Sequence, residues 1–188
     1  PKLTGVTIPS TVTNIAADAF YFCRGLTNLA IPGSVACVEQ NAFGGCGNLS
    51  RVALSDGVGC IADAFWQCTN LYRLTIPSSV TSISHLAFGY CGRLTEVYFR
   101  GNAPVSDGNP FYNCPAIRYY LPETTGWVPS ANCQLWLPRL QCEGNPGEAS
   151  SFAFDIHWAS GRIVVVEGCT NLALATWRPL QTNALAED

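Results

Sequence analysis

LYRLTIPSSVTSISHLAFGYCGR, residues 71–93, is one of five versions of the same unit. The other four versions occupy residues 3–25, 26–48, 49–70 and 94–116. The period is therefore 23 residues, with one residue missing from the third unit. Counted from the leading leucine as column 1, the units place apolar residues at columns 1, 4, 6, 10, 13 and 18. A fixed period of this length predicts a solenoid, in which each coil contacts only its two neighbours.

Two short extended segments are predicted in each coil. Columns 3 to 6 alternate polar and apolar residues, as in a half-buried strand. Proline at column 7 (Pro9, Pro32 and Pro77) is expected to end this strand, because proline has no N–H for the ladder. The Val-x-x-Ile step at columns 10 to 13 predicts the second segment. The Ala-Phe pair at columns 17 and 18 is expected to lie on a single helical or 3₁₀ turn.

No single unit can bury its six apolar residues alone, so stacking is expected to align each column into an apolar ladder. Burial of one phenylalanine side chain contributes roughly 1.5–3 kcal/mol. The column-18 ladder is therefore expected to be a main source of stability. It contains Phe20, Phe43, Phe65 and Phe88.

With Phe at column 18 and Cys at column 21, the units resemble the BspA-like, Treponema-type leucine-rich-repeat family. The repeat of that family reads approximately L-T-x-V-x-I-P-x-x-V-x-x-I-x-x-x-A-F-x-x-C-x-x, and residues 71–93 come close to it. The resemblance covers about residues 1–140 and implies a leucine-rich-repeat solenoid, β-rich, with short parallel strands and one-turn helices. It also implies a bacterial surface or secreted protein that acts in adhesion or in binding host and matrix components. No catalytic residues carry over.

The repeats at 3–116 are expected to be followed by a cap at 117–140, which together form one domain, residues 1–140. In the cap we predict a strand at 117–121, a loop closed by Trp127 and a short strand around 134–137. The aromatic residues of the cap are expected to cover the open end of the apolar ladders.

Residues 141–151 are rich in Gly, Pro, Ser and Glu and are interpreted as a linker. Residues 152–188 resemble the start of a β-sandwich-like module. Alternation at 152–156 and the β-branched run at 163–166 predict antiparallel strands with a turn at Ser160-Gly161. Three strands rarely stand alone, so this module is interpreted as partial.

The ten cysteines fall into groups by column. Five lie at column 21 and are interpreted as one ladder of buried free thiols, since a buried thiol behaves as a small hydrophobe; these are Cys23, Cys46, Cys68, Cys91 and Cys114. Cys37 and Cys60 share column 12 in adjacent coils, and both a disulfide and free thiols stay open there. Pairing among Cys133, Cys142 and Cys169 also stays open.

Composition excludes several classes of function. Charged residues make up 12% of the chain, the formal net charge is −3, and the ten Lys and Arg residues show no cluster in the sequence. A nucleic-acid or anionic-membrane partner is therefore disfavoured. No apolar run reaches the roughly 18 residues of a membrane span. The sequence contains no Met and no signal peptide. The chain is therefore interpreted as a piece of a longer secreted precursor.

An enzyme is not expected. Neither His85 nor His157 has a predicted partner for nucleophilic catalysis, since the thiol nearest to His85 in the chain, Cys91, lies in a buried column. No C-x-x-C pair or histidine pair predicts a zinc site, and no cofactor is expected.

The expected function is a non-enzymatic protein-binding or adhesion module that holds a protein or glycan ligand on the solenoid face. The alternative is a structural spacer or a module that self-associates into a homo-oligomer. In leucine-rich repeats the outward columns 3 and 5 form the concave sheet surface, where Arg and Tyr are common in interface hot spots. The candidate binding residues are Asn28, Arg51, Arg73, Glu96 and Tyr98. The competing interpretation is a solvated face on which an Arg–Glu pair contributes about 0–1 kcal/mol.

Overall fold

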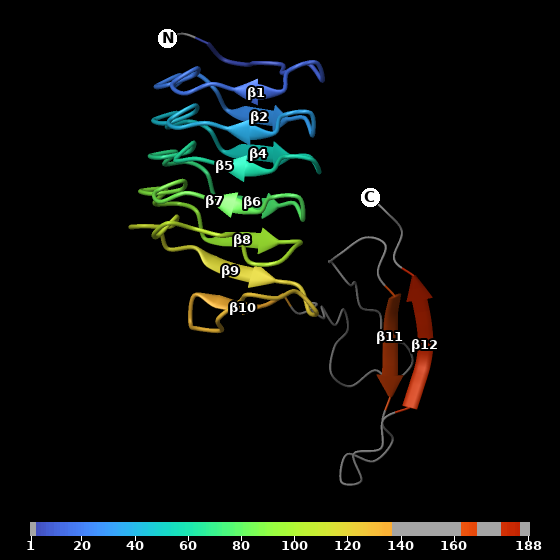
Figure 1. Ribbon diagram of the computed structural model, residues 1–188. Coiled ribbons are helices and arrows are strands. Elements are labelled where there is room, and N and C mark those ends of the chain that lie inside the picture. The colour runs from blue at the N-terminus through green and yellow to red at the C-terminus, as the bar shows by residue number, and fades with distance from the viewer. Residues whose placement is uncertain (1–2, 137–162, 169–177, 185–188) are drawn as a thin grey trace, which may run out of the picture. The chain divides into compact units, whose positions relative to one another are not determined.

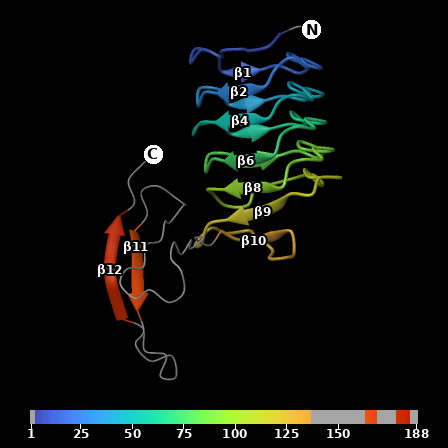
Figure 2. The same cartoon turned by 180° about the vertical axis from the view of Figure 1, so that it is seen from behind.

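The computed structural model describes residues 3–136, 163–168 and 178–184. The chain divides into two compact units, residues 1–136 and residues 137–188, and each is described by itself. The first unit is a solenoid of parallel strands, stacked one coil above another (Figures 1 and 2). The predicted fold class is confirmed for this unit.

The second, third and fourth coils each contribute a four-residue strand at columns 3 to 6 and a two-residue strand at columns 12 and 13. In the part of the solenoid that the structure describes, the first coil has only the short strand, the fifth coil has only the long one, and the cap adds a further long strand. The long strands are β2 (Asn28–Ile31), β4 (Arg51–Leu54), β6 (Arg73–Ile76), β8 (Glu96–Phe99) and β9 (Ile117–Tyr120). The short strands are β1 (Asn14–Ile15), β3 (Cys37–Val38), β5 (Cys60–Ile61) and β7 (Ser82–Ile83). The short strands form one continuous parallel ladder in the order β1-β3-β5-β7, in which equivalent columns face one another.

The ladder of long strands is interrupted, which the repeat pattern does not predict. β2 pairs with β4 in one sheet. A second sheet has the order β6-β8-β9-β10, where β10 is Cys133–Leu135. Within residues 3–136 no ladder joins β4 to β6. The solenoid therefore has a break between its third and fourth coils on this face.

Proline at column 7 removes one hydrogen bond from this junction. The N–H of Ser55 at this column donates to the Ile31 carbonyl at 3.0 Å, which joins the second and third coils. The N–H of Arg100 donates to the Ile76 carbonyl at 3.0 Å, which joins the fourth and fifth coils. Pro77 occupies the same column in the fourth coil and has no N–H to give to Leu54. Proline thus weakens the ladder to the preceding coil as well as ending its own strand.

A serine side chain joins the third and fourth coils at the turn beyond the break. The Ser79 hydroxyl accepts a hydrogen bond from the N–H of Gly57 at 2.9 Å and donates to the carbonyl of Val58 at 2.8 Å. The turns of the second and third coils approach each other closely at Gly33 and Gly57. A Cβ on Gly33 would lie 1.8 Å from the Asp56 carbonyl oxygen, so only glycine fits there.

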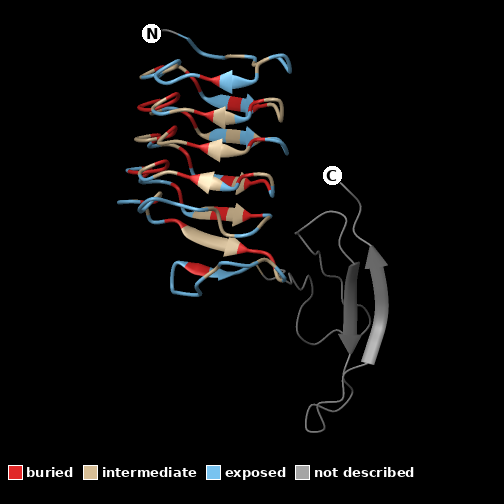
Figure 3. Ribbon diagram, viewed as in Figure 1, coloured by how far each residue is buried: buried red, intermediate tan, exposed pale blue. Residues whose placement is uncertain are grey.

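The predicted apolar columns form the core, and buried positions recur at the same places in successive coils (Figure 3). Phe43, Phe65 and Phe88 are fully buried. Their rings stack in line with the rings at either end, at centroid distances of 5.0, 5.6, 5.5 and 5.4 Å from Phe20 to Phe111. The phenylalanine ladder is confirmed and extends into the fifth coil.

The one-turn helices expected at the Ala-Phe pairs are wrong, because residues 3–136 contain no helix. Each pair lies in a hydrogen-bonded turn. The N–H of Phe43 donates to Ala64 in the next coil at 2.9 Å rather than to a residue one turn back. Backbone φ is also positive two residues before and two residues after the phenylalanine, at Asn41 (52°) and Gly45 (69°), which a right-handed helix does not allow.

The column-21 cysteines are free thiols, as predicted, and four of the five are buried. Each of four thiols donates to a backbone carbonyl of the preceding coil or of its own coil; for example, Cys91 Sγ lies 3.2 Å from the Phe65 carbonyl oxygen. Burial raises the pKa of Cys46 to about 11 and the pKa of Cys91 to about 12. These thiols are therefore protonated at neutral pH and unreactive.

The raised thiol pKa values predict a loss of stability in alkali. An unfolded thiol ionises near pH 8.5, so between about pH 9 and pH 12 the folded chain retains protons that the unfolded chain has released. The free energy of unfolding is then expected to fall as pH rises through this range and to be unaffected by these groups below it. Urea midpoints at pH 7.5 and pH 10 would measure the fall. Wild-type protein is expected to lose more than Cys91→Ala, and equal losses would contradict the assignment.

The cap follows the prediction closely. β9 begins at Ile117, as expected, and β10 lies beside it in parallel. The Trp127 ring packs 4.7 Å from Phe99 and 5.2 Å from Tyr120, so it covers the end of the apolar ladder.

In the second unit, β11 (Ile163–Gly168) and β12 (Arg178–Ala184) pair antiparallel. The β-branched run at 163–166 lies in β11, as predicted. The strand expected at 152–156, the turn at Ser160-Gly161 and the linker at 141–151 lie outside the described residues.

Candidate binding surface

The five candidate binding residues all lie on the long strands of the solenoid. Asn28 and Arg51 face each other in register on β2 and β4, and Arg73 faces Glu96 on β6 and β8. Tyr98 lies two residues after Glu96 on β8 and faces Tyr119 on β9. The break between β4 and β6 separates these residues into two groups.

The group beyond the break is tightly connected. Arg73 donates from Nε to a carboxylate oxygen of Glu96 at 2.8 Å and also forms an ion pair with it through Nη2. The hydrogen bond with Glu96 raises the pKa of Arg73 further above its usual value. The Arg73 guanidinium also lies 5.6 Å from the centre of the Tyr98 ring, within cation–π range.

An aromatic group continues this surface toward the cap. The Tyr98 ring lies 5.0 Å from Tyr119 and 4.7 Å from Trp136. All three side chains are partly exposed. Tyr119 and Trp136 are absent from the candidate set because they belong to the cap, outside the repeat columns that predicted the others.

A cleft of about 350 Å³ opens along the break between β4 and β6. Arg51, Arg73 and Arg100 line it, and Asp56 lies at its edge. A second hollow of about 390 Å³ is lined by Arg93 and by residues of columns 2 and 23. Tyr72, whose side chain is 47% exposed, lines both.

The two hollows bring four arginines together, which the sequence analysis missed. They lie on three different coils, so no basic run marks them in the sequence. The signal that could have found them is the column number: Arg51 and Arg73 share column 3, Arg100 follows the strand at column 7, and Arg93 ends its unit at column 23.

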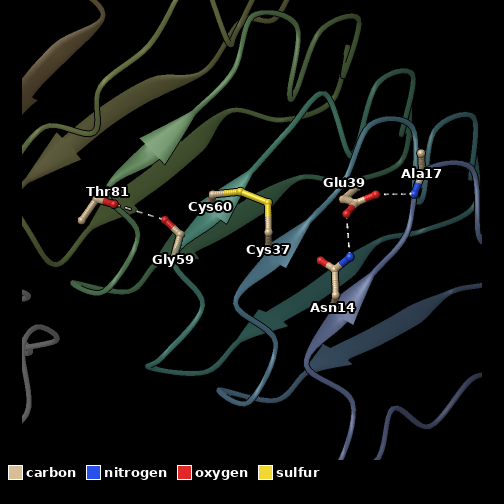
Figure 4. Close-up of a disulfide and its surroundings, with 7 residues drawn as sticks. All are labelled: Asn14, Ala17, Cys37, Glu39, Gly59, Cys60 and Thr81. Carbon is tan, nitrogen blue, oxygen red and sulfur yellow. Dashed lines mark hydrogen bonds between the residues drawn. A yellow bond between two sulfur atoms is a disulfide. The ribbon is translucent and has the colours of Figure 1, made fainter.

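The opposite corner of the coils carries a disulfide between Cys37 and Cys60, whose Cα atoms are 4.6 Å apart (Figure 4). These residues face each other in register on β3 and β5. At the preceding junction, between the first and second coils, Glu39 accepts hydrogen bonds from the Asn14 side chain at 2.5 Å and from the Ala17 N–H at 3.0 Å. The pairing left open by the sequence is therefore a disulfide, and it lies among contacts that join coils.

Of the two histidines considered for catalysis, His85 lies among the described residues and His157 lies outside them. His85 accepts a hydrogen bond from the Asn109 N–H at its Nδ1 atom, and its own N–H donates to Asp107. Cys91, by contrast, is fully buried. Among the described residues, no three His, Cys, Asp or Glu side chains form a group that could hold a metal ion. The described part of the chain also contains no helix long and apolar enough to span a membrane.

A stack of parallel-strand coils with a continuous core and an exposed strand face defines a repeat solenoid of the protein-interaction class. The chain belongs to the BspA-type leucine-rich-repeat family. A family model described as "BspA type Leucine rich repeat region" matches residues 2–118 with six copies.

A solved structure supports this assignment. The chain is similar to the leucine-rich-repeat protein of T. pallidum, known from a crystal structure, at 30% sequence identity and a TM-score of 0.58. The match covers 64% of this chain and 59% of that chain, so it spans less than two thirds of the relative. This chain matches no curated protein.

Proposed function

We propose that the solenoid is a non-enzymatic adhesion module of a bacterial secreted or cell-surface protein. It holds a protein or glycan ligand on the face of β2, β4, β6 and β8. The residues that contact the ligand are Asn28, Arg51, Arg73, Glu96 and Tyr98. The carrying observation is the connected group of Arg73, Tyr98, Tyr119 and Trp136, because exposed aromatic and arginine side chains on a rigid sheet are typical of binding hot spots.

Two further observations support the proposal. The Cys37–Cys60 disulfide favours an oxidising compartment, as outside the cell. The buried, protonated thiols offer no accessible nucleophile, which favours binding over catalysis. We also propose the division into a repeat domain at 1–140, a linker at 141–151 and a partial β-sandwich-like module at 152–188.

Binding to a panel of immobilised matrix and cell-surface proteins and glycans tests the proposal. At least one member is expected to bind, with Kd raised more than about tenfold by Arg73→Glu. Arg24→Glu is a matched control, since Arg24 lies three coils away and faces the Phe22 ring. Binding that is unchanged by Arg73→Glu would contradict the assigned face. Concentration-dependent dimers in sedimentation, without any panel ligand, would instead favour the self-associating spacer.

A further inference from the structure

The break between β4 and β6 exposes part of the apolar core. The apolar residues at columns 4 and 6 are buried in the second, fourth and fifth coils; in the fourth coil they are Leu74 and Ile76. Val52 and Leu54 are only partly buried, and both line the cleft. The floor of this cleft is therefore apolar, at columns that the second, fourth and fifth coils bury.

The rim of the same cleft is basic. Arg51, Arg73 and Arg100 surround it, and Arg93 lines the adjoining hollow beyond Tyr72. These are four of the ten Lys and Arg residues of a chain whose formal net charge is −3. Among the described residues that line the two hollows, Asp56 alone carries a carboxylate, and Glu96 adds a second negative charge through its ion pair with Arg73. Four arginines therefore stand against two carboxylates. The local charge is thus opposite in sign to the net charge of the chain.

We infer that this cleft is the binding site for an acidic peptide segment of a partner protein, in which carboxylate side chains alternate with apolar ones. The inference rests on the proposed function and names its partner class. Arginine pairs with carboxylates in a bidentate geometry, which suits the rim. The apolar floor distinguishes a peptide from a sulfated glycan, because a glycan has hydroxyl and sulfate groups but no aliphatic side chains to bury against Val52 and Leu54.

Tyr72 is a third part of this peptide-binding site, beside the apolar floor and the basic rim. Its ring stands between the two hollows and is 47% exposed. A peptide that crosses it places successive side chains in the cleft and in the adjoining hollow. Tyrosine suits this position because it offers a large apolar surface and a hydroxyl group at low entropic cost.

The test uses the full disulfide-bonded chain and a short fluorescein-labelled peptide in which Asp alternates with Val and Leu. Saturable binding is expected, weakened by added salt. Arg51→Glu and Arg100→Glu should each raise Kd by about tenfold, since one charge-assisted hydrogen bond is lost. Arg24→Glu should change Kd by no more than roughly twofold. In ¹⁵N-correlated NMR spectra, the peptide should shift the resonances of 51–54 and 72–77 and leave those of Tyr90 and Tyr112 in place.

Three comparison probes make the inference falsifiable. Replacing Asp by Asn in the peptide, or Val and Leu by Ser, should each weaken binding by about tenfold or more. A heparin-derived oligosaccharide that binds as tightly as the acidic peptide would overturn the inference in favour of an anionic glycan. Absence of saturable peptide binding, or an equal loss with Arg24→Glu, would also overturn it.

Failure here is distinguishable from failure of the proposed function. Suppose that Arg73→Glu weakens binding of a panel ligand but Arg51→Glu and Arg100→Glu do not. The proposed binding face would then be retained, and the cleft would be rejected as a binding site for an acidic peptide.

Discussion

Replacing Phe65 by alanine is expected to lower the free energy of unfolding by about 3–5 kcal/mol. The Phe65 side chain is fully buried, and its ring is nearly parallel to the neighbouring rings of Phe43 and Phe88, at 5.6 and 5.5 Å. Truncation leaves a cavity with unfilled space against both rings. Because each coil is stabilised mainly by its neighbours, loss at the central coil weakens two interfaces at once.

Urea denaturation followed by circular dichroism would measure this effect. Phe20→Ala is a matched control, because Phe20 ends the ladder, has a single stacked neighbour and is only partly buried. Its cost is expected to be clearly smaller than that of Phe65→Ala. Equal costs at the two positions, or an unchanged midpoint for Phe65→Ala, would contradict the continuous ladder.

The features that the sequence predicted correctly are those set by the period. Side chains at the same column must meet when coils stack, so the buried phenylalanines and the thiols at column 21 follow from counting residues. The Val-x-x-Ile step predicted a second extended segment at columns 10 to 13, and the short strands occupy columns 12 and 13 of it. Trp127 was predictable for a related reason, since an open apolar ladder requires an apolar cover at its end.

Two local features depended on hydrogen bonds that a column count does not contain. The turn at the Ala-Phe pair replaces a helix because the Phe43 N–H bonds to the next coil and Asn41 adopts a positive φ. Pro77 contributes to the break between β4 and β6, because it has no donor for the preceding coil. Proline was expected to end its strand, but its effect on the junction appears only when both coils are considered.

The residues that line the proposed binding surface could be placed only in part, for the same reason. Columns 3 and 5 identified Arg51, Arg73 and Tyr98 as outward residues. Arg100 and Tyr72 were not among the candidate binding residues, because they lie at columns 7 and 2. The exposure of these columns depends on the opening of the cleft. The Arg–Glu pair named by the competing interpretation, a solvated face, is present as the ion pair between Arg73 and Glu96.

The disulfide between Cys37 and Cys60 is expected to contribute about 3 kcal/mol to the free energy of unfolding. It closes a loop over a sequence separation of 23 residues, and restriction of the unfolded chain by a loop of this length accounts for that magnitude. It also fastens β3 to β5, in adjacent coils of the solenoid. Loss of the disulfide should therefore weaken the attachment of β3 to β5 and also raise the conformational entropy of the unfolded chain.

The double variant Cys37→Ser/Cys60→Ser would test this expectation by urea denaturation, beside peptide mapping of the non-reduced wild-type protein. Mapping should recover the two cysteines in one cross-linked fragment. Ser82→Ala is the matched control, because Ser82 faces Cys60 in register one coil further along, and such a surface change should alter stability by less than about 0.5 kcal/mol. Equal midpoints for the double variant and the wild type, with the cross-link present in the wild type, would mean that the stacked coils already restrain this corner without the covalent bond.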